Sequence, residues 1–423
     1  DHIFNFAHLP AMIAFESFVL DNGLKVVVHE DHSSPIAVVN LLYKVGARDE
    51  QSEKTGFAHL FEHLMFGGSK HVPSFDEPLQ YVGGDNNAFT SNDITNYYIT
   101  VPSVNLETAF WLESDRMLSL SFDPKVLEVQ RSVVIEEFKQ RYLNQPYGDA
   151  WLKLRPLAYK EHPYKWNTIG EKIEHIEEAT MEDVKAFFHQ YYVPNNAVLV
   201  VGGDVTLEQI KALSEKWFAP IPKGADIERN IPIESAQEEY RLLEVEEDVP
   251  VDALYMAFHM AGRNDDTYHS EDLLSDILGR GKSSRLYQVL VEEKKIFNGL
   301  SAYVMGALDP GLFVIQGKLN DKFDLETAEE AVWELLEEFK SSKLEKQELE
   351  KVKNKAESTM VFSDMELLNR AMNLAYADML GDLNLVNQEV EKVRAVTVDS
   401  VMSAANRVLS RSNASVLRYK AKQ

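Results

Sequence analysis

The chain has 423 residues, of which 45% are hydrophobic and 26% are charged, a composition typical of globular proteins rather than disordered ones. Its 43 basic and 68 acidic residues give a formal net charge of −25, which argues against nucleic acid and anionic membranes as partners. The sequence has no cysteine, which excludes disulfides, thiolate metal ligands and a cysteine nucleophile. A surface this acidic attracts cationic peptides, although solubility alone explains the charge equally well.

The first half of the chain alternates two kinds of segment. Short runs rich in β-branched and aromatic residues predict strands, and longer stretches with periodic apolar residues predict helices. Turn signals between the strands favour a mostly antiparallel sheet, so we expect α+β domains, each a sheet with helices packed on one face. The expected strands are residues 25–31, 36–45, 95–101 and 196–203, and the expected helices are residues 105–120 and 124–143.

The second half of the chain repeats features of the first half. Residues 256–265 are similar to residues 41–50 at an offset of 215, and each segment reads as a strand that ends in a turn before a long helix. Nearer the end of each half, a helix, a turn and a strand recur at an offset of 217. The matching pairs are Thr180 with Thr397, Val184 with Val401, Asn196 with Asn413 and Ala197 with Ala414. Chance similarity is the alternative, but two near-equal offsets favour an internal duplication.

The duplication predicts two homologous domains. We expect an N-terminal domain at residues 1–217, a linker at residues 218–239 and a C-terminal domain at residues 240–423. The linker is rich in proline and charged residues, as an exposed connection between domains usually is. A chain of this length also exceeds what one hydrophobic core usually serves. No apolar run in the sequence approaches the length of a membrane-spanning helix.

Three polar side chains share one face of a predicted helix in the stretch GFAHLFEHLMFGGS, residues 56–69. His59, Glu62 and His63 stand at i, i+3 and i+4, which places them on the same side of an otherwise apolar helix. Two residues four apart have Cβ atoms about 6 Å apart, close enough for both imidazoles to bind one tetrahedral metal ion. A third ligand has to come from elsewhere in the fold. The alternative is a pair of structural histidines that bond backbone carbonyls.

The second copy of this helix lacks the polar residues. At the offset of 215, the three polar positions fall opposite Leu274, Ile277 and Leu278. A helix that packs with three aliphatic residues does not need imidazoles and a carboxylate to fold, and burying such groups without partners costs several kcal/mol. The polar residues of the first copy therefore indicate chemistry. The spacing His-x-x-Glu-His is the reversed form of the zinc-protease helix, in which the glutamate activates water.

Five stretches of the chain together resemble the pitrilysin/insulinase family of zinc metallopeptidases. The resemblance is strongest to the branch that includes the mitochondrial processing peptidase and its bacterial relatives, whose subunits are about as long as this chain. It covers nearly the whole length and implies a bacterial cytoplasm or periplasm as the expected compartment. The stretches are residues 56–69, 83–102, 130–141, 162–205 and 278–295.

The resemblance implies one Zn²⁺ per chain, held by His59, His63 and a distant glutamate. The matching residue for that glutamate is Glu137, 74 residues after His63. Its neighbour Glu136 lies about 100° around a helix from Glu137, so only one of the two can face the metal, and the match favours Glu137. The implied activity is that of a metalloendopeptidase. In this reaction Glu62 takes a proton from water and returns it to the leaving amine.

The segment at residues 86–102 is similar to the substrate-binding edge strand of that family. An edge strand offers unpaired N–H and C=O groups to an extended peptide, and this mode of binding depends little on the side chains of the substrate. The run Asn87, Ala88, Phe89 and Thr90 matches the family pattern and is expected to lie along the substrate backbone. A plain hairpin strand is the alternative.

The chain departs from the family pattern at two places. A supporting glutamate seven residues before the third ligand is replaced by Gln130, which weakens a hydrogen bond without removing a ligand. Active members also supply an arginine and a tyrosine from the C-terminal half, where both assist substrate binding and the developing oxyanion. Glu292 and Gly299 stand at those two positions here, and neither side chain can perform that role.

The missing pair predicts that the chain acts as one subunit of a larger enzyme. We expect a related partner chain to supply the arginine and the tyrosine, which favours a heterodimer over a homodimer. The expected substrate is an unfolded or extended peptide. The alternative is a non-catalytic scaffold or peptide-binding subunit that keeps a relict zinc site, although a relict site has no reason to keep Glu62.

Overall fold

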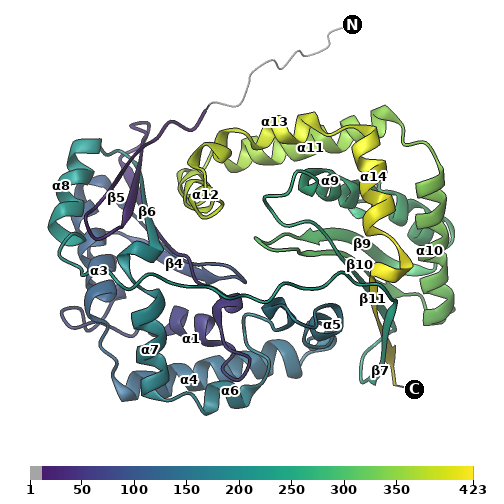
Figure 1. Ribbon diagram of the computed structural model, residues 1–423, viewed down its shortest axis with the longest axis horizontal. Helices are drawn as coiled ribbons and strands as arrows, with labels where there is room; N and C mark the ends of the chain where they lie inside the picture. The colour runs from purple at the N-terminus through teal and green to yellow at the C-terminus, as the bar shows by residue number, and fades with distance from the viewer. Residues whose placement is uncertain (1–11, 423) are drawn as a thin grey trace, which may run out of the picture.

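The computed structural model of the protein describes residues 12–422, so the first eleven residues of the expected N-terminal domain and Gln423 lie outside it. Figure 1 shows two sheets on opposite sides of the molecule, one from each half of the chain, with helices around and between them. The N-terminal half contains β1 Glu16–Val19, β2 Lys25–Glu30, β3 Ile36–Tyr43, α1 Phe57–Leu64, α2 Asp76–Tyr81, β4 Asp85–Thr90, β5 Thr95–Pro102, α3 Leu106–Ser119, α4 Pro124–Phe138, α5 Ala150–Ala158, α6 Ile173–Glu177, α7 Met181–Tyr191, β6 Ala197–Gly203 and α8 Leu207–Trp217.

The C-terminal half repeats this arrangement. It contains β7 Arg241–Glu247, β8 Ala253–His259, α9 Tyr268–Gly279, β9 Phe297–Met305, β10 Leu312–Leu319, α10 Leu325–Ser341, α11 Lys346–Ser363, α12 Leu367–Met379, α13 Glu389–Ala395, α14 Val398–Val408 and β11 Ala414–Ala421. None of the helices in the described part of the chain is long and apolar enough to cross a membrane.

The two sheets have the same topology apart from one additional strand. The N-terminal sheet has the order β1-β2-β6-β3-β5-β4, and the C-terminal sheet has the order β7-β11-β8-β10-β9. In each sheet one pair is parallel, β2 with β6 and β7 with β11, and the other pairs are antiparallel. The prediction of two homologous α+β domains with mostly antiparallel sheets is therefore confirmed.

The duplication extends to individual hydrogen bonds. Thr180 and Thr397 begin α7 and α14 with the same capping box, in which the side chain of the cap accepts from the third residue of the helix. Asn196 Nδ2 donates to the carbonyls of Lys44 and Tyr191, and Asn413 Nδ2 donates to the carbonyls of His259 and Val408. The acceptors are themselves equivalent, one at the C-terminal end of a central strand, β3 or β8, and one at the end of the helix. Both halves thus lock the helix, the turn and the strand together in the same way.

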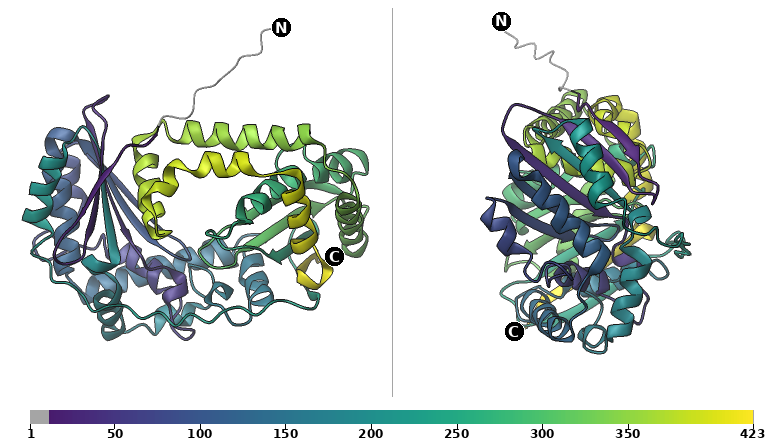
Figure 2. Two further views of the ribbon diagram at one scale, coloured as in Figure 1. Left: turned by 45° about the horizontal axis from the view of Figure 1, so that its top comes forward. Right: turned by 90° about the vertical axis from the view of Figure 1, so that its left-hand side faces the viewer.

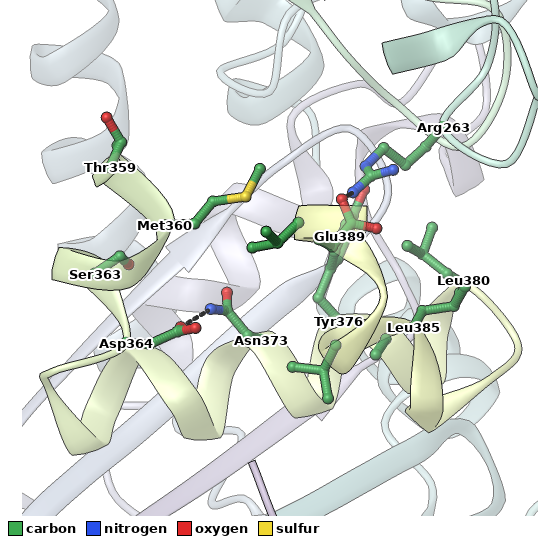
Figure 3. A pocket seen from close by; sticks show the side chains of 13 residues that line it. Arg263, Thr359, Met360, Ser363, Asp364, Asn373, Tyr376, Leu380, Leu385 and Glu389 are labelled. Carbon is green, nitrogen blue, oxygen red and sulfur yellow. Dashed lines mark hydrogen bonds and ion pairs between the residues drawn. The ribbon is translucent and has the colours of Figure 1, made fainter. Parts of the chain in front are cut away.

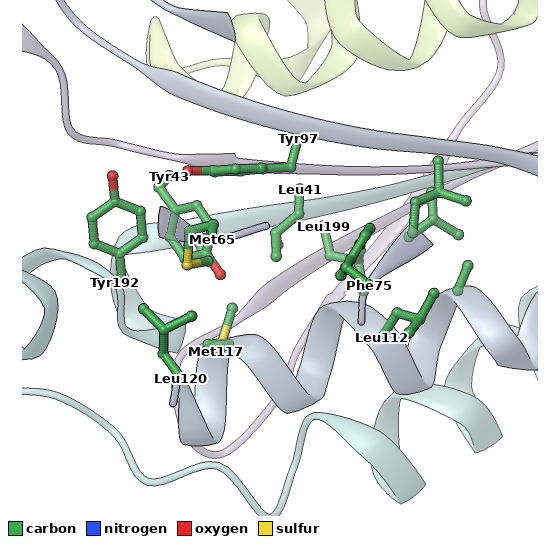
Figure 4. Close-up of a cluster of buried hydrophobic side chains, with 14 of the residues drawn as sticks. Leu41, Tyr43, Met65, Phe75, Tyr97, Leu112, Met117, Leu120, Tyr192 and Leu199 are labelled. Carbon is green, nitrogen blue, oxygen red and sulfur yellow. The ribbon is translucent and has the colours of Figure 1, made fainter. Parts of the chain in front are cut away.

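The core of the N-terminal half lies between its sheet and the helices on the outer face. Figure 4 shows part of it, where Leu41, Tyr97 and Leu199 of three neighbouring strands face Leu112 and Met117 of α3. All five side chains are buried. Burying one such side chain stabilises the fold by about 1.5–3 kcal/mol relative to leaving it exposed.

The inner face of each sheet is covered by a helix from the opposite half of the chain. Helix α12 lies against β3 and β6 of the N-terminal sheet, and α5 lies against β7, β8 and β11 of the C-terminal sheet (Figures 1 and 2). The two helices begin 217 residues apart, so they are the same element of the duplicated unit. Apolar residues of each helix join a buried cluster with the strands that it covers. The two halves therefore complete one another's cores.

Two segments differ in detail from the sequence-based expectation. The helix expected at residues 124–143 is α-helical only to Phe138 and continues as a π-helical turn at Lys139–Leu143. The segment at residues 218–239 contains no helix or strand, as expected, but it is fixed to the N-terminal half. Arg229 Nε lies 2.7 Å from Asp49 Oδ1, and the carboxylate of Glu234 accepts the backbone N–H groups of residues 160–162.

An ion-pair cluster joins α12 to the sheet that it covers. The carboxylate of Asp378 lies 2.6 Å from Lys25 Nζ and 2.8 Å from Lys44 Nζ. Burial alone would raise the pKa of Asp378, but the two ammonium groups together lower it below the ordinary value of 3.8. Because the folded-state pKa is lowered, the cluster contributes stability above about pH 4, and that stability is lost as the pH falls through the lowered pKa.

We predict that Asp378→Asn destabilises the protein by about 1–3 kcal/mol at neutral pH, because two ammonium groups lose their partner. The difference from the wild type should shrink below about pH 4, where the wild-type carboxylate also becomes neutral. Midpoints of urea unfolding at both pH values measure the effect. Asp226→Asn is the control, since that side chain is 90% exposed and only pairs with a neighbouring lysine. Equal effects of the two substitutions at neutral pH would contradict the prediction.

Candidate metal centre

Helix α1 is fixed at its N-terminus by a buried carboxylate. Glu50 accepts the backbone N–H groups of Gly56 and Ala58, both at 2.9 Å. These N–H groups have no partner within the helix, and a carboxylate is favoured at the positive end of the helix dipole. Burial raises the pKa of Glu50 well above its usual range. Gly56 itself has φ +85°, and a Cβ there would lie 2.8 Å from the carbonyl oxygen of Ile169.

The other end of α1 and its inner face are packed into the core. Leu60, Phe61 and Leu64 are buried, and the ring of Phe61 stacks on that of Tyr192 with centroids 5.0 Å apart. The buried guanidinium of Arg116 lies near the C-terminal end, where Nη1 donates to the carbonyl of Met65 at 3.4 Å. These contacts fix the rotation of α1 about its own axis. Its remaining face carries His59, Glu62 and His63, all half-buried.

Helix α4 places Glu137 opposite the two histidines. Asp123 caps this helix by accepting from the N–H of Lys125, and a proline occupies its first position. Val134 and Phe138 are buried on one side of α4 and set its rotation. The side chain of Glu137 is 19% exposed and faces α1, while that of Glu136 is 61% exposed. Glu137 therefore faces the two histidines, and Glu136 faces solvent.

The two imidazoles and the carboxylate of Glu137 converge. The Nε2 atoms of His59 and His63 are 3.3 Å apart, and Glu137 Oε2 lies 3.5 Å from each of them. Ligands about 2.0–2.2 Å from a tetrahedral zinc ion lie about 3.3–3.6 Å from one another. The three ligand atoms thus have the separations of three corners of a zinc tetrahedron. Among the residues that the structure describes, no other group of His, Asp and Glu converges in this way.

The protonation states suit metal binding and proton transfer. Burial, with a further contribution from the neighbouring His63 and Arg141, lowers the pKa of His59 to about 3. His59 is therefore neutral at physiological pH and keeps a lone pair for a metal. Burial also raises the pKa of Glu62, while a hydrogen bond from Thr90 works in the opposite direction. The Thr90 hydroxyl donates to Glu62 Oε2 at 2.5 Å, so one carboxylate oxygen is fixed.

Strand β4 lies at the edge of the N-terminal sheet and passes beside α1. Among the described residues its only strand partner is β5, so its other side is not paired with a strand, although the N–H of Ala88 donates to Oδ1 of Asn87. Its side chains alternate, and Ala88 and Thr90 are half-buried while Asn87 and Phe89 are exposed. Of this predicted substrate-binding run, only Thr90 contacts the predicted metal centre through its side chain. Phe89 borders a cavity of about 400 Å³ between the two halves of the molecule.

Two groups at the site were not found by sequence reasoning. Glu50 precedes α1 by several residues in a turn, and nothing in the local pattern distinguishes it from the other acidic residues. Arg141 Nη1 lies 2.9 Å from Glu137 Oε1. The spacing of Arg141 from Glu137, i to i+4 on a predicted helix, is a signal that would have indicated this contact.

The remaining predicted positions lie away from these contacts. Glu292 is exposed on the helical turn Tyr287–Glu293, and Gly299 lies on β9 with open space where a Cβ would stand. A second cavity, of about 300 Å³, lies between α11, α12 and α13 (Figure 3). Its lining combines apolar residues with polar ones, among them the Arg263–Glu389 ion pair and the Asp364–Asn373 hydrogen bond, and none of the predicted site residues borders it.

Comparison with known proteins identifies relatives of the chain. A family model described as Insulinase (Peptidase family M16) matches residues 25–165, and a model described as Peptidase M16 inactive domain matches residues 178–356. The zinc protease PqqE of Helicobacter pylori is 34% identical over 346 residues, which make up 80% of this chain and 77% of the relative. The probable β subunit of the mitochondrial-processing peptidase of Arabidopsis thaliana is 26% identical over 252 residues, 58% of this chain and 47% of the relative.

A solved structure extends the similarity over the whole fold. The crystal structure of a protease from Helicobacter pylori superposes with a TM-score of 0.90 at 29% identity, covering 97% of this chain and 100% of that one. Family models thus match both halves, and a relative with 34% identity spans four fifths of the sequence. The chain therefore belongs to the M16, or insulinase, family of peptidases.

Proposed function

We propose that the protein is a zinc-dependent endopeptidase subunit, with His59, His63 and Glu137 as metal ligands and Glu62 as the catalytic base. The observation that carries the proposal is the set of 3.3–3.5 Å separations between the three ligand atoms, which matches a zinc tetrahedron. Relatives named zinc proteases support the choice of metal. Residues 1–217 and 240–423, joined by a linker at 218–239, are proposed as the two domains.

The residues of the chain divide the proton chemistry between them. Zinc, when bound, acts as a Lewis acid that polarises the peptide carbonyl and makes water more acidic. Glu62 takes the proton from the attacking water and delivers it to the leaving amine. Thr90 occupies Oε2 of Glu62, so Oε1 is the oxygen free to carry the proton. The raised pKa of Glu62 favours this role, because a carboxylate with a higher pKa is a stronger base.

The substrate we propose is an extended or unfolded peptide that pairs with the edge of β4. Pairing through backbone groups would place a peptide bond beside α1, with Asn87, Ala88, Phe89 and Thr90 along its path. The cavity that Phe89 borders gives room for a substrate side chain on the other face of the strand. The net charge of −25 favours cationic peptides.

The active enzyme, in this proposal, needs a partner chain. Glu292 and Gly299 stand where the family pattern has an arginine and a tyrosine, so the chain lacks donors that would stabilise the developing oxyanion. A relative is named as the β subunit of a peptidase, which is consistent with a subunit role for this chain. The second candidate function is a peptide-binding scaffold with a relict zinc site, and the same missing pair favours it.

We predict that Glu62→Gln lowers peptide hydrolysis by about 10²–10⁴-fold, because the proton acceptor is lost, while the zinc content stays the same. Cleavage of a quenched fluorescent peptide and metal analysis of the same samples measure the two effects. If the wild type binds zinc but cleaves nothing, alone or with any related chain, the scaffold function is correct and the peptidase function is wrong.

The adjacent glutamates provide a matched test of the third ligand. Glu137→Gln should reduce zinc binding by at least about tenfold, because a carboxylate ligand becomes a neutral amide. Glu136→Gln makes the same chemical change one residue earlier, at a side chain that faces solvent, and should leave zinc binding unchanged. Zinc affinity is measured by competition with a chromophoric chelator. Tight zinc binding by Glu137→Gln would remove this residue from the ligand set.

The partner requirement can be tested by restoring the missing pair in this chain. We predict that Glu292→Arg combined with Gly299→Tyr raises the activity of the purified chain by about tenfold or more, because a second copy of the chain then takes the place of the partner and brings the oxyanion donors to the metal centre. The open space at Gly299 accommodates a side chain. Glu293→Arg with Gly299→Tyr is the control, because it makes the same charge change out of register. A wild-type chain that is already fully active alone would contradict the proposed partner.

A further inference from the structure

The two oxygens of Glu137 have different partners. Oε2 lies 3.5 Å from the Nε2 atom of each histidine, where a shared metal would be bound. Oε1 lies 2.9 Å from Nη1 of Arg141, in the π-helical turn Lys139–Leu143 that follows α4. Single π-helical turns within α-helices are frequent at functional sites. One oxygen thus faces the proposed metal, and the other is held by a guanidinium.

A carboxylate ligand needs such support because its last torsion is soft. The terminal χ angle of a glutamate rotates through a broad range, so an unsupported group can present either oxygen or both. Hydrogen bonds to the second oxygen restrict a metal-bound carboxylate and tune the affinity of the site. Arg141 is the group that the structure places in this role.

The rest of the site makes this support more important. Nδ1 of His59 is buried and has no hydrogen-bond partner among residues 12–422, so the second ring nitrogen does not orient the imidazole. Residue 130 lies seven residues before Glu137, about two helical turns earlier and on the same face, and it is a neutral glutamine. The orientation of Glu137 therefore depends on the residue that follows it on the same face of the helix.

The competing explanation is that Glu137 and Arg141 form an ordinary surface ion pair with no effect on metal binding. Glu and Arg at i and i+4 on an exposed helix stabilise it by only about 0.3–0.5 kcal/mol. The pair of Glu136 with Lys139 on the same turn is of that kind, since both side chains are substantially exposed, 61% and 44%. The pair of Glu137 with Arg141 differs because the carboxylate is only 19% exposed and its other oxygen faces two imidazoles.

We propose that Arg141 is a positioning residue that holds Glu137 as a one-oxygen metal ligand. The proposal rests on the proposed zinc function. Because the Arg141 side chain is 70% exposed, its removal should leave the folded structure intact. The other N–H groups of the guanidinium point to solvent, so Arg141 is not part of the packed core.

Zinc affinity of three variants tests the proposal. Arg141→Met should weaken zinc binding by about 10–100-fold, the usual effect of losing a group that supports a ligand. Lys139→Met removes the same charge two residues earlier without touching Glu137, and should change the affinity by less than about threefold. Arg141→Lys should recover part of the loss, because a lysine restores the charge but not the planar donor geometry.

Two further measurements separate this role from a structural one. Thermal unfolding of the metal-free proteins should be the same for wild type and Arg141→Met. The absorption spectrum of the cobalt-substituted protein should change in Arg141→Met, as the carboxylate gains a second contact with the metal, and not in Lys139→Met. Equal zinc affinity of wild type and Arg141→Met would overturn the positioning role and leave the zinc function intact. Failure of the wild type to bind zinc would overturn both.

Discussion

The site depends on one constraint, which is the fixed rotation of α1 about its own axis. Glu50 accepts the first N–H groups of the helix, and Arg116 donates to the carbonyl of Met65, the residue that follows its last turn. Leu60, Phe61 and Leu64 pack into the core beneath it. A helix held at both ends and along one side cannot rotate without opening the core, which is expensive in a close-packed interior. The packing of α1 therefore directs the two imidazoles and Glu62 toward α4 without any contribution from a metal. This arrangement lowers the cost of assembling the ligands, because most of their ordering is achieved by folding.

The duplication shows how little the fold itself requires of these positions. Leu274 and Leu278 of α9 are buried where the first copy has histidines, and among the described residues no group of His, Asp and Glu in the second half converges as His59, His63 and Glu137 do. The second copy contributes α12, which covers the inner face of the first sheet, just as α5 covers the inner face of the second. The proposed metal ligands thus lie in one copy, and the exchange of helices makes that copy dependent on the other for its stability.

The sequence predicted the class of fold because strand alternation and the repeated offsets are local signals. It could not predict the exchange of α5 and α12, since periodicity shows that a helix has an apolar face but not which sheet that face will cover. At the site, the i, i+3, i+4 spacing was enough to group the residues of α1, and the geometry now supports Glu137 over Glu136. Thr90 was expected along the substrate backbone, and the sequence did not predict that the alternation of β4 also points its hydroxyl to Glu62. Glu50 had no local signal, because its role appears only when the chain folds back on the start of α1.

The turn after β4 connects the proposed site to the C-terminal half of the chain. Asp93 in this turn accepts the N–H of Leu308 at 2.9 Å and the hydroxyl of Tyr164 at 2.5 Å, and Arg48 lies between Asp93 and Asp309. Leu308 and Asp309 belong to the turn between β9 and β10, so the edge strand of the first sheet is anchored by the second half. Since Thr90 ends β4 three residues before Asp93, the position of its hydroxyl on Glu62 follows from this anchor. The C-terminal half of the chain, which has none of the proposed metal ligands, therefore helps to set the geometry of the half that carries them.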